Sequence, residues 1–114
     1  MTQHNDDLYL LHMLESAQKA LAFVQGKTRS DYDQDEVLQL ALLHLIQTVG
    51  EAAHNISEDY QHQHPEIAWK PIMGIRHRIV HNYADIDHEV IWKTVTDDLP
   101  PLVKVLERLI SPEK

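Results

Sequence analysis

The segment from Leu38 to Ile56 has the apolar pattern that most restricts how this chain can fold. Its apolar side chains recur at alternating steps of four and three residues, at Leu38, Leu42, Leu45, Val49, Ala52 and Ile56. This spacing places them on one face of an α-helix and is close to a coiled-coil heptad. Further apolar residues widen that face, at Leu40, Ala41, Leu43, Ile46 and Ala53. Such a helix needs partners on more than one side, so it is either the central helix of a bundle or a dimer interface as well.

A similar pattern predicts a helix before this segment. We expect it to begin at Asn5-Asp6-Asp7, where a capping side chain and two acids suit the positive end of the helix dipole. Its apolar face is formed by Leu10, Leu14, Ala17, Leu21 and Val24, and Gly26 is the expected C-terminal cap. A polar loop from Lys27 to Gln34 then leads to Asp33 or Asp35, either of which can begin the second helix.

The C-terminal half predicts further helices. A polar stretch from Ser57 to His64 leads to Pro65, which suits the first turn of an amphipathic third helix that continues through Val80. We expect Pro71 to kink that helix or to separate a short leading turn. The segment Asp85-Ile86-Asp87 begins the next helix, residues 97–101 break or bend it, and residues 102–110 form the last one. No alternating pattern predicts a strand, so the expected fold is an all-α, up-and-down bundle of four main helices plus a short or kinked fifth.

Composition narrows the class of protein. A chain of 114 residues is expected to form one domain, over residues 1–114. It contains no cysteine, and the formal net charge of -8 argues against broad, nonspecific binding of nucleic acid. No apolar run is long enough to span a membrane, and the polar first residues do not resemble a signal peptide, so a cytoplasmic location is expected.

One segment departs from this acidic composition. Residues 70–83 contain Lys70, Arg76 and Arg78 together with His77 and His81, but no carboxylate. Such a segment is either a local anion site or a dimer contact. As chemistry, the set suits metal-free cleavage of RNA: His81 can take a proton near neutral pH, and Arg76 can bind a phosphate through two hydrogen bonds. The alternative is that both arginines are solvated or paired with carboxylates and that His81 is a satisfied interface histidine.

The spacing of Arg76 and His81 raises a geometric difficulty. Residues five apart on an ideal helix point about 140° away from each other. Either the helix ends after Val80, or two copies of the chain pool their residues across a symmetric dimer. His77 and His81 also have the i, i+4 spacing of metal ligands, but no His-Glu-x-x-His pattern accompanies them and the flanking arginines would repel a dication. We therefore expect neither a metal site nor a cofactor.

Glu51 is the one carboxylate late in the apolar second helix. An unpaired carboxylate is costly to bury, so we expect Glu51 to pair with Arg76 or Arg78 and to orient that arginine. The alternative is that its carboxylate reaches solvent.

The motif Arg76-x-x-x-x-His81-x-Tyr83 resembles the R-x-x-x-x-H-x-Y signature of the HEPN superfamily, in the form found in HepT-like toxins. Surrounding elements make the resemblance more specific: Gly50-Glu51-Ala52-Ala53, Pro65-Glu66-Ile67-Ala68-Trp69, Gly74-Ile75-Arg76, and Trp92 with Asp98-Leu99-Pro100. They cover roughly residues 5–110. The chain departs from the pattern at Ala68, where proline is common, and at Asn82, where glycine is common.

This resemblance implies a ribonuclease that dimerises and brings two copies of the motif into one cleft. Arg76 and His81 would be catalytic. Around them we expect Lys70, His77, Arg78 and Asn82 to support RNA binding, with Glu51 as a supporting residue that orients an arginine. It also implies a type VII-like toxin–antitoxin pair, in which an MntA-like nucleotidyltransferase transfers AMP onto Tyr83. A charged adduct beside Arg76 and His81 would block an RNA phosphate. The alternative is a non-catalytic helical adaptor that positions substrate for a partner nucleotidyltransferase.

Overall fold

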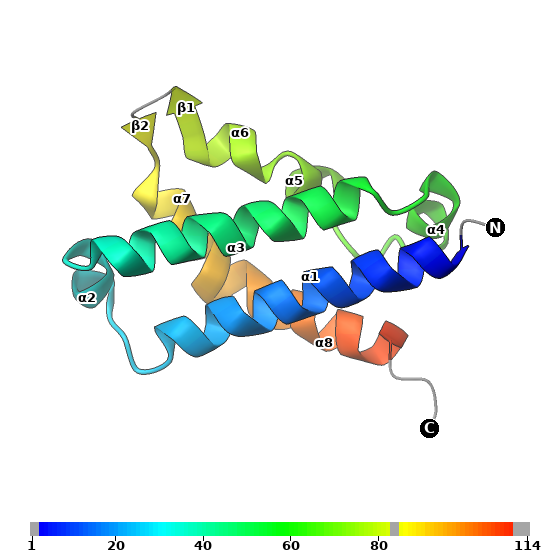
Figure 1. Cartoon of the computed structure of the whole chain (residues 1–114), viewed down its shortest axis with the longest axis horizontal. Helices are drawn as coiled ribbons and strands as arrows, with labels where there is room; N and C mark the ends of the chain where they lie inside the picture. Colours follow the sequence, from blue (N-terminus) through cyan, green and yellow to red (C-terminus); the bar gives the residue numbers. More distant parts are fainter. Residues whose placement is uncertain (1–2, 83–84, 111–114) are drawn as a thin grey trace.

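The computed structural model of the chain describes residues 3–82 and 85–110, with side chains from Asn5 onward. Two long helices, α1 (Gln3–Val24) and α3 (Glu36–His54), lie side by side and pack along one another (Figure 1). The C-terminal helical segment, which ends in α8 (Leu99–Ile110), crosses behind them and packs against α1. The predicted helical bundle is confirmed, since the described chain is mainly α-helical.

The second predicted helix is confirmed, and its apolar stripe is buried. Asp35 is its N-cap, and the side chain accepts a hydrogen bond of 3.0 Å from the backbone N–H of Leu38. Every member of the stripe from Leu38 to Ile56 is buried, in one apolar cluster that also contains Met13, Ile79 and Leu106. Val37 and Leu40 lie outside this core, 78% and 57% exposed. The stripe therefore faces the bundle, while part of the wider apolar surface faces solvent.

Helix α1 also follows its prediction, with a difference at its start. Gly26 has a φ of +73° and the N–H of Lys27 donates to the Val24 carbonyl, which is the left-handed C-terminal cap expected of a glycine. The helix begins at Gln3, before Asn5. Asp6 is buried, and its carboxylate accepts hydrogen bonds from the N–H and the hydroxyl of Ser57. Asp6, which was expected to cap α1, thus joins α1 to Ser57, the residue just before the helix at Glu58–Gln63.

The predicted loop from Lys27 to Gln34 and the polar stretch from Ser57 to His64 each contain a short helix that was not predicted. Helix α2 (Arg29–Asp33) begins at a capping box, in which Thr28 and Asp31 bond to each other's backbone N–H groups. Helix α4 (Glu58–Gln63) has Ser57 as its N-cap. Both helices lack an apolar stripe of their own, which is why periodicity did not reveal them, although their capping residues were visible in the sequence.

The third predicted helix is broken into two short ones. Residues 65–68 are not helical; α5 covers Trp69–Met73 and α6 covers Ile75–Ile79, with Gly74 between them. Pro71 causes no kink, because it lies in the first turn of α5, where no backbone donor is lost. A Cβ atom built at Gly50 would lie 2.9 Å from the carbonyl oxygen of Ile72, so α3 approaches α5 where no side chain fits.

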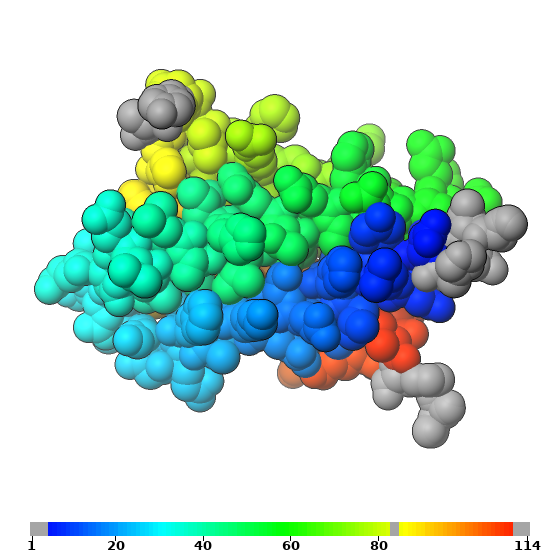
Figure 2. Space-filling model, in the orientation of Figure 1, coloured from blue at the N-terminus to red at the C-terminus, as the bar shows by residue number. Residues whose placement is uncertain are grey.

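The chain forms a small hairpin after α6, although no strand was predicted. Strand β1 (Val80–Asn82) pairs antiparallel with β2 (Asp85–Ile86). Val80 is opposite Ile86 and Asn82 is opposite Asp85, so His81 is the extra residue of a β-bulge. Strands this short carry no readable alternation, which explains the wrong prediction. Figure 2 shows this described part of the hairpin projecting from one edge of the molecule.

The C-terminal segment is bent and not broken. Helix α7 (His88–Lys93) has Asp87 as its N-cap and continues through a π-helical turn, η1 (Thr94–Asp98), into α8. The N–H of Leu99 donates to the carbonyl of Thr94, five residues earlier. Pro100 and Pro101 follow in the first turn of α8 and supply no N–H, so a wider turn accommodates them. None of the described helices has the length and apolarity needed to cross a membrane.

Candidate active site

Helix α6 presents its basic residues to solvent. Ile75 and Ile79, four residues apart, are buried in the core, and Arg76, His77 and Arg78 between them are exposed. Among the described residues, no carboxylate lies within 4.0 Å of the guanidinium of Arg76 or Arg78. Within the described part of a single chain these arginines are therefore not paired with carboxylates, which was one of the two alternatives. An exposed guanidinium without such a partner is available to an anion.

His81 does not continue the helix that holds Arg76. Helix α6 ends at Ile79, and Val80 already has an extended backbone, with φ -106° and ψ 101°. The angle of about 140° between the two residues belongs to a continuous helix and does not apply here. The structure thus follows the first of the two alternatives predicted from the spacing, in which the helix ends before His81. For the same reason His77 and His81 do not share a helical face, although they are four residues apart.

The imidazole of His81 faces the carboxylate of Asp87. Nε2 of His81 lies 3.4 Å from Oδ2 of Asp87, and both side chains are partly exposed. Oδ1 of the same carboxylate accepts the N–H of Val90 at 3.1 Å, as the N-cap of α7. The bond from Val90 first, and the bond from His81 after it, lower the pKa of Asp87, which keeps the carboxylate ionised in weak acid.

The other predicted site residues occupy separate positions around α6. Lys70 is exposed on α5, Asn82 is exposed on β1, and Glu51 is exposed late in α3. Glu51 reaches solvent and makes no ion pair with an arginine among the described residues. Its pairing with an arginine of a second copy stays a prediction. Tyr83 lies outside the described residues.

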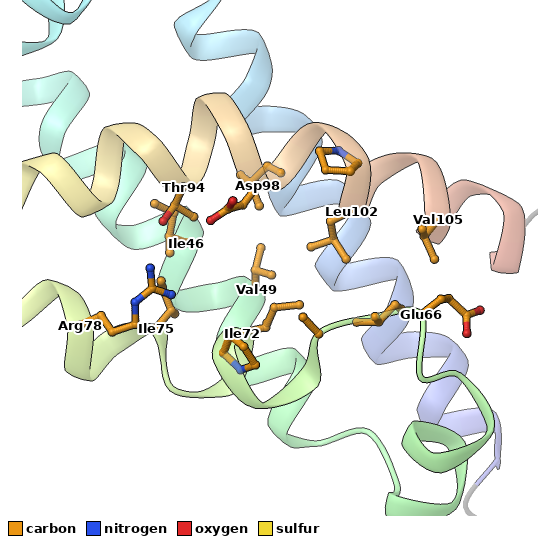
Figure 3. A pocket seen from close by; sticks show the side chains of 15 residues that line it. Ile46, Val49, Glu66, Ile72, Ile75, Arg78, Thr94, Asp98, Leu102 and Val105 are labelled. Carbon is orange, nitrogen blue, oxygen red and sulfur yellow. The ribbon is translucent and has the colours of Figure 1, made fainter.

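A cavity of about 340 Å³ lies between α3, the segment 66–72, η1 and α8 (Figure 3). Its walls are mostly apolar, formed by Val49, Ile72, Ile75 and Leu102 among others. Arg78, Thr94 and Asp98 line it together (Figure 3). The hydroxyl oxygen of Thr94 is buried and has no hydrogen-bond partner within the described part of the chain. Arg78 therefore has an apolar cavity on one side and solvent on the other.

Sequence reasoning missed the contact between Asp87 and His81. It identified Asp87 only as the beginning of a helix, because the contact with His81 depends on a hairpin that no strand pattern predicted. The available signal was a capping residue placed six positions after a candidate base. The contribution of Thr94 to the cavity has no sequence signal. Among the described residues, no group of three or more His, Asp or Glu side chains is arranged to hold a metal ion.

Comparison with known proteins gives the chain its family. A family model described as "Ribonuclease HepT-like" matches residues 13–109. The chain is 34% identical over 100 residues to a protein named "Probable ribonuclease HepT" from Thermococcus cleftensis, covering 84% of this chain and 91% of that protein. It is 29% identical over 106 residues to a protein named "Putative RNase" from Caldanaerobacter subterraneus subsp. tengcongensis, covering 93% and 95%.

A third relative, also named "Putative RNase", comes from Methanocaldococcus jannaschii. It is 27% identical over 107 residues, covering 94% of this chain and 98% of that protein. The search of solved structures returned no match. The family match agrees with the helical architecture. The chain belongs to the HepT-like family of HEPN-type ribonucleases.

Proposed function

We propose that this protein is a metal-independent endoribonuclease toxin that uses Arg76 and His81. The observation that carries the proposal is an exposed arginine on α6 with no carboxylate partner among the described residues, followed on β1 by a histidine whose ring is hydrogen-bonded to Asp87. The relatives named as ribonucleases support the same class of activity. Arg76 supplies a permanent positive charge for phosphate, and His81 supplies a group that can exchange protons.

The reaction follows from these two groups. His81 takes the proton of a ribose 2′-hydroxyl, and the 2′-oxygen forms a bond to the adjacent phosphorus. Arg76 stabilises the negative charge that accumulates on the phosphorane oxygens. The bond between phosphorus and the 5′-oxygen then breaks, and an imidazolium protonates the departing oxygen. The products are a 2′,3′-cyclic phosphate and a 5′-hydroxyl. Lys70, His77, Arg78 and Asn82 extend the surface that would hold the RNA.

The active form is proposed to be a homodimer. Val37 and Leu40 are exposed apolar side chains on α3, the helix whose apolar surface exceeds what the bundle covers. A second copy packed through α3 and the α5–α6 segment would cover them and bring two motifs to one cleft. In that arrangement Glu51 of one copy would be available to an arginine of the other.

Regulation is proposed to follow the family pattern of a type VII-like toxin–antitoxin pair. The partner would be an MntA-like nucleotidyltransferase that transfers AMP to the hydroxyl of Tyr83. The adduct would add negative charge and bulk two residues from His81, where the RNA phosphate must approach. This part of the proposal rests on the sequence motif.

A ribonuclease assay with purified protein tests the proposed function. Wild-type protein should cleave RNA in the presence of EDTA and leave 2′,3′-cyclic phosphate ends. Arg76→Ala and His81→Ala should both be inactive with unchanged circular dichroism, because each replaces an exposed side chain. Lys93→Ala, an exposed cation on α7, is the matched control and should keep full activity. Cleavage that Arg76→Ala leaves intact, or none by the wild type, would instead support the adaptor.

A further inference from the structure

We propose that Asp87 is a positioning residue that holds the His81 ring with its proton on Nε2 and leaves the Nδ1 lone pair to act as the base. The inference rests on the proposed ribonuclease function, which assigns a base to His81 but does not say which ring nitrogen acts. It gives Asp87 a role beyond that of a helix cap. The evidence is the 3.4 Å contact between Nε2 and Oδ2 and the way in which the carboxylate itself is held.

The carboxylate of Asp87 is fixed independently of His81. Its Oδ1 accepts the N–H of Val90 at 3.1 Å, and its own backbone N–H donates to the carbonyl of Ile79 at 2.7 Å. The first bond ties the side chain to the start of α7, and the second ties the backbone to the end of α6. With Oδ1 and the backbone held, the direction of Oδ2 is set before the imidazole meets it. This is the preorganisation that a positioning group requires.

The hairpin brings His81 to this oxygen. His81 is the extra residue between the pairs Val80–Ile86 and Asn82–Asp85, and a bulge redirects the side chain that it inserts. Among the described elements, α6 and β2 make the main contacts with β1. Their charged and titratable groups are Arg76, His77 and Arg78 on α6 and Asp85 on β2. Among the described residues, only the carboxylate of Asp87 has a hydrogen bond to His81.

Hydrogen-bond chemistry assigns the ring nitrogens. A neutral imidazole has one N–H donor and one acceptor lone pair, whereas an ionised carboxylate can only accept. The nitrogen that faces Asp87 must therefore carry the proton, so Nε2 is the donor and Nδ1 keeps the lone pair. When Nδ1 takes the 2′-hydroxyl proton, the resulting imidazolium already lies beside a negative charge. Asp87 thus orients the base and stabilises its protonated form without losing its own charge, as in carboxylate–histidine pairs of hydrolases.

Asp87→Asn is the variant that separates this role from capping. Asparagine is as good an N-cap as aspartate, so α7 should begin at the same residue and the helix content seen by circular dichroism should not change. The amide has no charge and can donate to Nε2, which favours the opposite tautomer. We expect kcat to fall by on the order of tenfold, with KM unchanged, because the pair is partly exposed and water replaces some of the contact. Asp85→Asn makes the same charge change on β2 and should behave as wild type.

Ring ¹⁵N shifts of His81 give a readout that does not depend on activity. At mildly alkaline pH the wild type and Asp85→Asn should show a protonated Nε2 and an unprotonated Nδ1, while Asp87→Asn should show more of the Nδ1–H form. The proposal is overturned if Asp87→Asn keeps both the wild-type shifts and the wild-type kcat, or if Asp85→Asn loses as much activity. Wild-type protein that cleaves no RNA, yet shows the expected shifts, would reject the ribonuclease and retain the contact.

Discussion

The phenol oxygen of Tyr32 lies 2.7 Å from Nδ1 of His88, which joins α2 to the first turn of α7. The Tyr32 ring is fully buried and also packs against Trp92, with 5.4 Å between the ring centroids. Arg29 on the same short helix forms ion pairs with Asp33 and Glu89. Because His88 follows Asp87 directly, these contacts tie α2 to the first turn of the helix that Asp87 caps. Helix α2, which periodicity did not predict, therefore supports the start of α7 beside the candidate active site.

The first prediction concerns alkaline pH. Burial raises the pKa of Tyr32 to about 12, while an exposed phenol titrates near 10. A raised folded-state pKa contributes stability that is complete below the unfolded value of about 10 and is lost as the pH rises through about 12. Urea midpoints should therefore fall over this range in the wild type and fall less in Tyr32→Phe. Tyr60, whose pKa burial also raises, is present in both proteins, so the difference isolates Tyr32. Equal losses in both proteins would contradict the assignment.

The second prediction concerns the buried hydroxyl of Thr94. Its oxygen has no hydrogen-bond partner among the described residues, so its desolvation is uncompensated. Thr94→Val keeps the shape and removes the polar atom, and should stabilise the protein by about 1 kcal/mol, or raise Tm by about 4 °C. Thr96→Val is the matched control, because the Thr96 hydroxyl donates to the Trp92 carbonyl at 2.9 Å and its loss should not stabilise. Calorimetry that shows a lower Tm for Thr94→Val would mean that the hydroxyl has a partner in solution.

The third prediction concerns assembly. Leu40 is 57% exposed on α3, and Leu40→Asp should weaken a dimer formed through that helix by placing a charge in the interface. Light scattering should show wild type at twice the 13.2 kDa chain mass and the variant shifted toward one chain. Phe23→Asp alters a similarly exposed apolar residue, 45% exposed on α1, and should leave the dimer intact. Wild-type protein that is monomeric at micromolar concentration would reject the dimer.

The fourth prediction concerns Tyr83. Tyr83→Phe removes only the acceptor oxygen, and a free phenol titrating near pH 10 is a poor acid for the leaving oxygen, so most ribonuclease activity should remain. Incubation with an MntA-like nucleotidyltransferase and ATP should add AMP to the wild type and silence it, but should leave the variant active. Peptide mass spectrometry locates the adduct. A variant as inactive as His81→Ala, or AMP on Tyr9, Tyr32 or Tyr60, would contradict the regulatory role.

The sequence predicts the parts of this structure that depend on long apolar stripes. The stripe from Leu38 to Ile56 predicted α3 and its burial correctly, because each residue contributes to one face over five turns. Gly74 and Ile79, where the third helix was expected to continue, show the limit of this method. The apolar positions of α5 and α6 keep a helical spacing across the break at Gly74, so their pattern alone does not reveal it.

The candidate site was likewise predictable only in part. Arg76 and His81 could be identified from residue type and motif, since both their chemistry and their spacing are local. Their relative geometry could not, because it depends on a helix end at Ile79 and on a bulge that only strand pairing creates. The contact of Asp87 with His81 is tertiary in the same sense. Inserting or deleting one residue in the hairpin would abolish the contact between His81 and Asp87 without substituting either residue.

The π-turn between α7 and α8 has a consequence for insertions and deletions in this chain. A π-turn holds one residue more than an α-turn, so η1 can be regarded as a regular helix that carries a single inserted residue. Deleting one residue there would make α7 and α8 one continuous helix and rotate α7 by about 100° relative to α8. The apolar face of α8 would still pack against α1, and most of the bundle would be preserved. Asp87, however, would turn away from β1, so the helical register of α7 determines whether His81 has a partner.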